Sequence, residues 1–358
     1  MMLRLALSLS VVCAACGGDD GGAGVEAGPT CTPLVAAPVG TGTVQNAVPV
    51  GDQLAVLLRR DTAMVLATVD AAGAVTEVTV GGGATGGGAV AVDPQGRACV
   101  AWVGAQSHVQ AACAPTWQAT DTGLEAESNS ALFLAYETSA CATAAGGCVP
   151  NPQWVMHFQG GFASASYASS DDGVAWTETD LFISSVTAPT SVTSMTGQIV
   201  ACVAGNGGAT LVTYHPYRGE IDDVQRWGSR GSRCAVVADG RTLHLVSSDD
   251  AQLTYVAWDF PYLPSAPWEA PAPLAAQPAL AVTSGAPLAA GLIAGQLHVA
   301  FVDATGATVE ATRAGAEWSV ATLSTQRAAA IALATGPGMS ATVATLGSAT
   351  SLWRSCQP

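Results

Sequence analysis

The chain of 358 residues contains no lysine, because all 12 of its basic residues are arginine. Schiff-base chemistry on a lysine side chain and lysine-bearing phosphate loops are therefore excluded. Charged residues of all kinds make up only 11% of the chain, and the net charge is −15. Nucleic acids and anionic membrane surfaces favour positive patches on their partners, so we expect neither as a direct partner of the protein surface.

Sequence motifs of common catalytic sites are also missing. The chain has no G-x-S-x-G elbow, no H-E-x-x-H pattern and no paired cysteine–histidine motif. Helical periodicity is nearly absent, and no apolar run approaches the roughly 20 residues that span a bilayer. The sequence therefore predicts no cofactor and no metal site. His244 and His298 lie in strand-like runs, where we expect hydrogen-bonded strand residues rather than ligands.

What the chain does contain is typical of short strands and tight turns. Hydrophobic residues make up 49% of it, with 40 glycines and 19 prolines. Strand-length apolar or alternating runs are separated by Asp-x-x-Gly turns at 70–73, 93–96 and 303–306. Aspartate opens such turns by capping backbone amides, and glycine accepts the positive φ. This pattern predicts an all-β sandwich, barrel or propeller.

Tryptophan spacing favours the propeller among these three. Five tryptophans recur at intervals of 41 to 59 residues: Trp117, Trp176, Trp227, Trp268 and Trp318. One aromatic landmark and several strands every 40–50 residues or so is typical of a propeller blade. We predict seven blades, with six as the alternative. The ring would be closed by pairing an N-terminal strand near 35–44 with the C-terminal strands.

One segment carries a sharper motif. Residues 169–176 read SSDDGVAW and match S-x-D-x-G-x-x-W at Ser169, Asp171, Gly173 and Trp176. This resembles the Asp-box of sialidase-type (BNR-repeat) β-propellers, and the resemblance implies a structural turn at a blade edge. Sialidases also need an early R-I-P motif, but here Arg59-Arg60 is followed by Asp61-Thr62. No catalytic residue of that family can be carried over.

The N-terminus has the features of an export signal. Arg4 precedes the apolar run 5–12, and small residues then lead to Cys16. This resembles a bacterial lipoprotein signal cut before Cys16; the alternative is an ordinary signal peptide cut near Ala15. The expected organisation is a signal peptide over 1–15, the lipidated Cys16 with a flexible tether over 16–30, and a single propeller domain over 31–358.

Eight cysteines remain after the signal and the lipidated position. An even number in an exported chain predicts disulfides. Spacing and strand positions favour the four pairs Cys31–Cys356, Cys99–Cys113, Cys141–Cys148 and Cys202–Cys234. Metal binding is the weaker alternative, because no two of these eight have C-x-x-C spacing.

Polar and aromatic side chains are concentrated in the segment 214–227. The candidate binding residues there are Tyr214, His215, Tyr217, Arg218, Asp222, Arg226 and Trp227. Aromatic rings beside arginines and carboxylates could recognise a glycan or a protein partner. The alternative is a solvated loop whose charges pair with each other.

Taken together, the sequence predicts a lipid-anchored β-propeller of the cell envelope, expected at the outer membrane. It would act as a binding or scaffold module for an unidentified protein or glycan, with the membrane contacted through the lipid. The alternative is an extracellular glycan hydrolase or lyase on a sialidase-like propeller. Carboxylates and arginines converging at the mouth of the central channel would favour the enzyme.

Overall fold

The computed structural model describes most of the chain from residue 34 onward. The described ranges are 34–128, 130–138, 152–160, 165–180, 186–195, 198–205, 208–215, 220–227, 233–239, 242–249, 252–259, 280–283, 285–315, 317–336 and 339–356, with backbone alone for many residues between 179 and 259. All of them belong to one compact unit, residues 31–358. Cys31, Cys141 and Cys148 lie outside the described residues, as do the predicted signal and tether.

The described strands form seven antiparallel sheets, which we number 1 to 7 along the chain. Sheet 1 contains β2 (Thr43–Val50), β3 (Gln53–Arg60), β4 (Ala63–Val69) and β5 (Val75–Gly81). Sheet 2 contains β6 (Gly88–Val92), β7 (Ala98–Val103), β8 (His108–Cys113) and β9 (Thr120–Glu125), with the 3-10 turn η1 (Ala105–Ser107) before β8. Sheet 3 contains β10 (Leu132–Glu137), β11 (Gln153–Gln159), β12 (Ala165–Ser170) and β13 (Thr177–Asp180).

The remaining sheets follow the same order. Sheet 4 contains β14 (Val186–Met195), β15 (Gln198–Gly205), β16 (Gly208–His215) and β17 (Glu220–Trp227). Sheet 5 contains β18 (Arg233–Asp239), β19 (Thr242–Asp249) and β20 (Gln252–Asp259). Sheet 6 contains β21 (Leu288–Ile293), β22 (Gln296–Val302), β23 (Thr308–Ala314) and β24 (Glu317–Ser324). Sheet 7 contains β25 (Ala328–Gly336), β26 (Met339–Leu346), β27 (Ala349–Cys356) and β1 (Leu34–Thr41).

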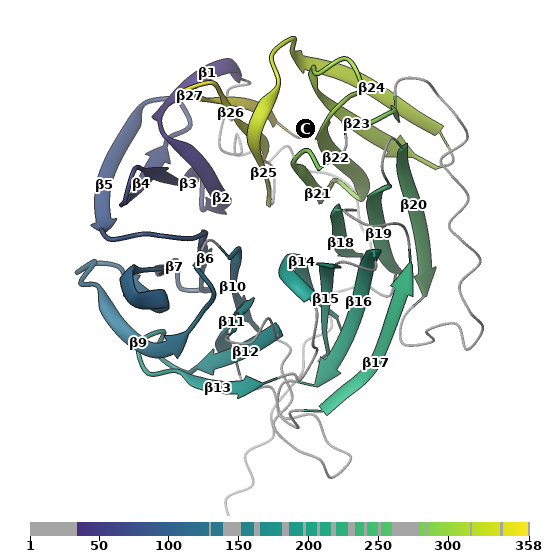
Figure 1. Cartoon of the computed structure of the whole chain (residues 1–358). Coiled ribbons are helices and arrows are strands. Elements are labelled where there is room, and N and C mark those ends of the chain that lie inside the picture. The colour runs from purple at the N-terminus through teal and green to yellow at the C-terminus, as the bar shows by residue number, and fades with distance from the viewer. Residues whose placement is uncertain are drawn as a thin grey trace, which may run out of the picture. The chain divides into compact units, whose positions relative to one another are not determined.

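The sheets are arranged in a ring (Figure 1). The first strand of each sheet contacts the first strand of the next, from β2 through β6, β10, β14, β18 and β21 to β25, which contacts β2 again. The all-β propeller predicted from the sequence is confirmed. Six sheets have the four strands of a complete blade, and sheet 5 has three described strands.

The N- and C-terminal strands close this ring. β1 pairs antiparallel with β27, with Leu34 opposite Arg354 and Thr41 opposite Ala349. The N-terminal strand is therefore the outermost strand of sheet 7, and the predicted closing strand is present. Arg354, which is 3% exposed, donates from Nη2 to the Asp70 carbonyl at 2.8 Å and from Nη1 to the Ala71 carbonyl at 3.1 Å. These two bonds fasten sheet 7 to sheet 1.

Burial on both faces of a sheet explains why many strands are continuously apolar. In β3, Leu54, Val56 and Leu58 pack in the cluster shared with sheet 7, whereas Ala55 and Leu57 pack in the cluster shared with sheet 2. Successive side chains of a strand point to opposite faces, so both sets must be apolar when both faces are covered. The core of the propeller therefore lies between neighbouring sheets.

Two of the predicted cysteine pairs are disulfides. Cys99 on β7 is bonded to Cys113 on β8, directly opposite it in sheet 2, with a Cα–Cα distance of 4.1 Å. Cys202 on β15 is bonded to Cys234 on β18, which joins sheet 4 to sheet 5. The pairs Cys31–Cys356 and Cys141–Cys148 stay predictions.

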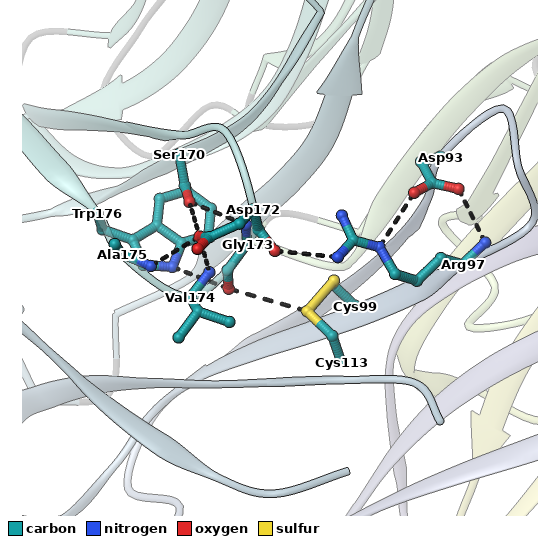
Figure 2. The surroundings of a disulfide bond; sticks show 10 residues. All are labelled: Asp93, Arg97, Cys99, Cys113, Ser170, Asp172, Gly173, Val174, Ala175 and Trp176. Carbon is teal, nitrogen blue, oxygen red and sulfur yellow. Dashed lines mark hydrogen bonds and ion pairs between the residues drawn. A yellow bond between two sulfur atoms is a disulfide. The ribbon is translucent and has the colours of Figure 1, made fainter. Parts of the chain in front are cut away.

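A hydrogen-bonded turn links β12 to β13. The Ser170 hydroxyl accepts from the amide of Gly173 at 2.8 Å, and Asp172 Oδ1 accepts from the amides of Val174 and Ala175 at 2.8 and 2.9 Å (Figure 2). Gly173 has a φ of +77°, a conformation that favours glycine. The positive φ directs the following amides toward the carboxylate.

This turn corrects the residue assignment made from the motif. Ser170 and Asp172 hold the turn, one position after the predicted Ser169 and Asp171, and Asp171 is exposed. The physical reason is that Asp172 immediately precedes Gly173, so its carboxylate faces the amides that the glycine reorients. Trp176 packs against the cores beside sheet 3 and donates from Nε1 to the Gly173 carbonyl at 3.2 Å.

The same turn packs on the disulfide of sheet 2. A Cβ atom at Gly173 would lie 3.0 Å from Cys113 Sγ and 3.1 Å from Cys99 Sγ, so only glycine fits without a shift. Arg97 donates to the Asp172 carbonyl at 3.1 Å (Figure 2). The Arg97 guanidinium also lies over the ring of Trp154, with 5.3 Å to the ring centre. The turn therefore joins sheets 2 and 3.

Candidate functional site

The binding surface predicted at 214–227 lies in the outer hairpin of sheet 4. Tyr214 and His215 end β16, where they pair with Ile221 and Glu220, and Asp222 is the extra residue at a register shift. Arg226 and Trp227 pair instead with Thr210 and Ala209, near the opposite end of the hairpin. Four residues of strand separate these groups by about 13 Å. Tyr217 and Arg218 lie outside the described residues, so the recognition surface stays a prediction.

The inner strands of the propeller carry little charge. The three charged residues in β2, β6, β10, β14, β18, β21 and β25 are Glu137, Arg233 and Asp239. Glu137 and Asp239 end their strands, and Arg233 begins β18. Arg233 stands at the opposite end of β18 from Asp239, and the described inner strands contain no second arginine, so they hold no cluster of arginines with carboxylates. The glycan-hydrolase alternative therefore gains no support here.

A cavity of about 300 Å³ lies between sheets 6 and 7. The inner part of this interface is closed, because a Cβ at Gly291 would lie 2.6 Å from Thr335 Cγ2. The cavity opens beside the outer strands. Its polar and aromatic lining includes Glu310, Thr312 and Ser319 of sheet 6 and Ser340, Thr342, Trp353 and Ser355 of sheet 7.

Small side chains explain why a cavity exists at this interface. The buried apolar cluster here consists of Ala286, Val302, Ala328 and Ala344. On the opposite side of sheet 6, larger residues such as Val299 and Phe301 fill the interface with sheet 5. Alanine, serine and threonine facing one another cannot fill the same space, so a polar-lined cavity remains.

Glu310 joins the two sheets at the edge of the cavity. Its Oε1 lies 2.6 Å from His298 Nδ1, and its Oε2 accepts from the Thr342 hydroxyl at 2.5 Å. Thr312 Oγ1 lies 3.2 Å from the same histidine nitrogen. Burial acts to raise the pKa of Glu310, but the hydrogen bonds from His298 and Thr342 outweigh it, and the pKa is lowered. The carboxylate is therefore held ionised and fixed in position.

Hydroxyl groups and one aromatic ring complete the lining. Ser340 Oγ and Ser355 Oγ are 2.5 Å apart on neighbouring strands, and Trp353 lies between them and the cluster of Ala344. Arg354 also lines the cavity, and its guanidinium donates from Nη1 and Nη2 to carbonyls of sheet 1. Such a site can exchange hydrogen bonds with a small hydroxylated ligand and present an aromatic face to it.

Metal-ligand clusters and membrane-spanning helices are both absent from the described residues. No group of three or more histidine, cysteine, aspartate or glutamate side chains in the described ranges could hold a metal ion. Among the same residues, no helix is long and apolar enough to cross a membrane.

Sequence reasoning missed the cavity but described the state of His298, the partner of Glu310, correctly. His298 and His244 are both hydrogen-bonded strand residues, as expected. Glu310 was not singled out, although a carboxylate within the strand-like run 308–314 is unusual for a segment covered on both faces. A charged residue in a strand expected to be buried on both faces is the signal that could have identified Glu310.

Comparison with known proteins supports the fold alone. No protein-family model matches the chain, and no curated protein matches it. The structure is similar to the BP39L lectin from Burkholderia pseudomallei, with a TM-score of 0.68 and 14% identity over 91% of this chain and 97% of that chain. It is also similar to the fucose-specific lectin from Aleuria aurantia, with a TM-score of 0.53 and 14% identity over 79% and 96%. A puromycin-hydrolysing peptidase from Mycobacterium tuberculosis gives a TM-score of 0.55 and 10% identity over 90% of this chain and 53% of that chain. Because these identities are low, the chain is assigned to the β-propeller fold and to no family.

Proposed function

We propose that the protein is a glycan-binding β-propeller whose site is the cavity between sheets 6 and 7. The observation that carries the proposal is the combination of an ionised, fixed Glu310, hydroxyls on both sheets and the ring of Trp353 around one cavity. Its volume of about 300 Å³ is in the range of small-molecule sites. Two proteins with similar propellers are named as lectins, which is consistent with this use of the fold.

The proposed ligand is a neutral sugar unit. Glu310 accepts hydrogen bonds and repels anions, and both Nη atoms of Arg354, which also lines the cavity, are already bonded to carbonyls of sheet 1. Sugar hydroxyls can donate to the carboxylate and exchange hydrogen bonds with the serine and threonine hydroxyls. The apolar face of a sugar ring would lie on Trp353.

We further propose that this propeller is held at the cell envelope. The N-terminal sequence, with Cys16 as the lipidated residue, supports an anchor in the outer membrane followed by a flexible tether. An anchored propeller with a ligand cavity would hold glycans, or a glycan-bearing partner, at the cell surface or in the periplasm.

Glycan binding by site variants tests this function. We expect the native protein to bind members of a neutral glycan array, and Glu310→Gln to weaken that binding on the order of tenfold or more, since a charged hydrogen-bond acceptor is lost. Glu77→Gln is the matched control, because Glu77 pairs with Arg60 within sheet 1 and does not line the cavity. Calorimetric titration with the best array ligand gives the affinities. An array without bound glycans, or equal affinity in folded Glu310→Gln, would reject the proposal.

A further inference from the structure

Sheets 5 and 6 share a histidine arrangement. His244 is the third residue of β19 and His298 the third residue of β22, and each follows a leucine. His244 Nδ1 lies 2.8 Å from the Tyr255 hydroxyl, just as His298 Nδ1 lies 2.6 Å from Glu310. Tyr255 and Glu310 both stand on the third strand of their sheets. The His244–Tyr255 pair at the interface of sheets 5 and 6 is thus equivalent in position to the His298–Glu310 pair at the interface of sheets 6 and 7.

The charge of the two networks is opposite. Glu310 contacts Thr342 of the next sheet, whereas Tyr255 contacts Arg313 of the next sheet. Arg313 donates from Nη1 to the Tyr255 hydroxyl, and its Cζ lies 4.0 Å from the centre of the Tyr255 ring. Stacking and hydrogen bonding together hold the guanidinium in one orientation.

One edge of this guanidinium is unused. Arg313 Nε is buried without a hydrogen-bond partner, and no group in the described residues accepts from Nη2. No described carboxylate forms an ion pair with Arg313. The Nε–Nη2 edge is one of the edges of arginine that bind a carboxylate or a similar oxyanion through two parallel hydrogen bonds.

Aromatic rings border the same position. Trp318 on β24 meets the Tyr255 ring edge-on, with 5.8 Å between the ring centres, and His244 stacks on Tyr255 at 6.0 Å. All four side chains are partly buried. Rings beside a fixed guanidinium provide an apolar surface for a ligand body next to a binding edge for its charge.

We propose that Arg313, with Tyr255 and Trp318, forms a second binding position that takes an oxyanion carried on a sugar, either a carboxylate or a sulfate ester. The position does not depend on the cavity between sheets 6 and 7, where Glu310 disfavours anions. The overall charge of −15 repels anions from most of the surface, so the local guanidinium selects where they bind.

Titration with small charged sugars tests this second position. We expect glucuronate or glucose 6-sulfate to bind the native protein more tightly than glucose does, and the probe that binds identifies the oxyanion. Arg313→Gln should weaken that binding on the order of 10- to 100-fold, because a two-bond charged contact is lost. Arg313→Lys should recover part of it, since the charge returns without the planar edge. Arg327→Gln, at an exposed arginine between β24 and β25, should have no effect.

Two controls separate this proposal from the proposed function. Glu310→Gln should leave glucuronate and sulfate binding unchanged, whatever it does to neutral glycans. Binding to the native protein should also weaken as salt is raised from about 20 to 200 mM, because added salt screens the attraction between the oxyanion and the guanidinium. Equal binding of glucose and both charged probes, no salt dependence, or full binding in folded Arg313→Gln would each overturn the second position.

Discussion

His157 illustrates what enclosure between two sheets does to one titratable side chain. It is 3% exposed, and its ring centre lies 5.3 Å from that of Tyr167 on the neighbouring strand. Burial lowers its pKa from 6.5 to about 3, since the charged imidazolium loses its hydration. The side chain is therefore neutral in the folded protein at pH values where the unfolded chain is already protonated.

The protein should lose stability in mild acid because of this residue. Between about pH 6.5 and pH 3 the unfolded state binds a proton at His157 that the folded state does not, so the free energy of unfolding falls by roughly 1.4 kcal/mol per pH unit. Urea unfolding at pH 7.0 and pH 5.0 measures the loss. His157→Gln should remove most of it, whereas a variant as acid-sensitive as the native protein would contradict the assignment. The lowered pKa of Glu310 contributes only in more acidic solution.

At the scale of strands and sheets, the two disulfides have different structural roles. Cys99–Cys113 joins adjacent strands within sheet 2 and supports the turn around Gly173. Cys202–Cys234 joins two sheets, and both sulfurs belong to the apolar cluster between them. The first bond closes a loop of 14 residues and the second a loop of 32.

Loop length predicts the order of their contributions to stability. Replacing both cysteines of the first pair with alanine should lower the free energy of unfolding by about 3 kcal/mol, and replacing the second pair should cost somewhat more, because a longer loop loses more entropy when closed. Urea unfolding of the two double variants under non-reducing conditions measures both values. Unchanged midpoints for either variant, or a clear reversal of the order, would contradict this account.

The elements were more predictable than the candidate site. Strand runs, Asp-x-x-Gly turns and tryptophan spacing follow from local chemistry, and they predicted the propeller and the closing strand near 35–44. The cavity depends instead on which faces meet across a sheet interface. No local pattern shows that Glu310 on β23 faces Thr342 on β26, 32 residues later. The sequence likewise suggested that the polar residues of 214–227 form one cluster, because local sequence does not show strand register. In the structure, that register separates Arg226 from Tyr214.

At the scale of the whole molecule, the fold supports the proposed ligand sites, whereas the N-terminal sequence supports the proposed location. The fold positions two networks of opposite charge at successive sheet interfaces. The proposed location at the cell envelope rests on the sequence around Cys16, which lies outside the described residues.

Intact mass spectrometry of the protein from bacterial membranes tests the proposed anchor. We expect a chain beginning at Cys16 that carries diacylglycerol and gains about eight hydrogens on reduction, as four disulfides require. Cys16→Ser should abolish the lipid, whereas Cys13→Ser should retain it, because Cys13 is removed with the signal. A native chain without lipid would reject the anchor, and a smaller gain in hydrogens would reject one or both unobserved pairs.

The pairing of β1 with β27 also determines how late in folding the ring can close. The amide of Val44 donates to the Thr345 hydroxyl, a contact across 301 residues of sequence. Bringing together the ends of so long a flexible chain costs roughly 5 kcal/mol of loop entropy, before any constant is added. Contacts within sheets 1 to 6 span far fewer residues, so those sheets can form first and ring closure follows. Until the last strand is available, a folding intermediate would leave the edge of sheet 7 unpaired, and any partner that holds this edge would delay ring closure.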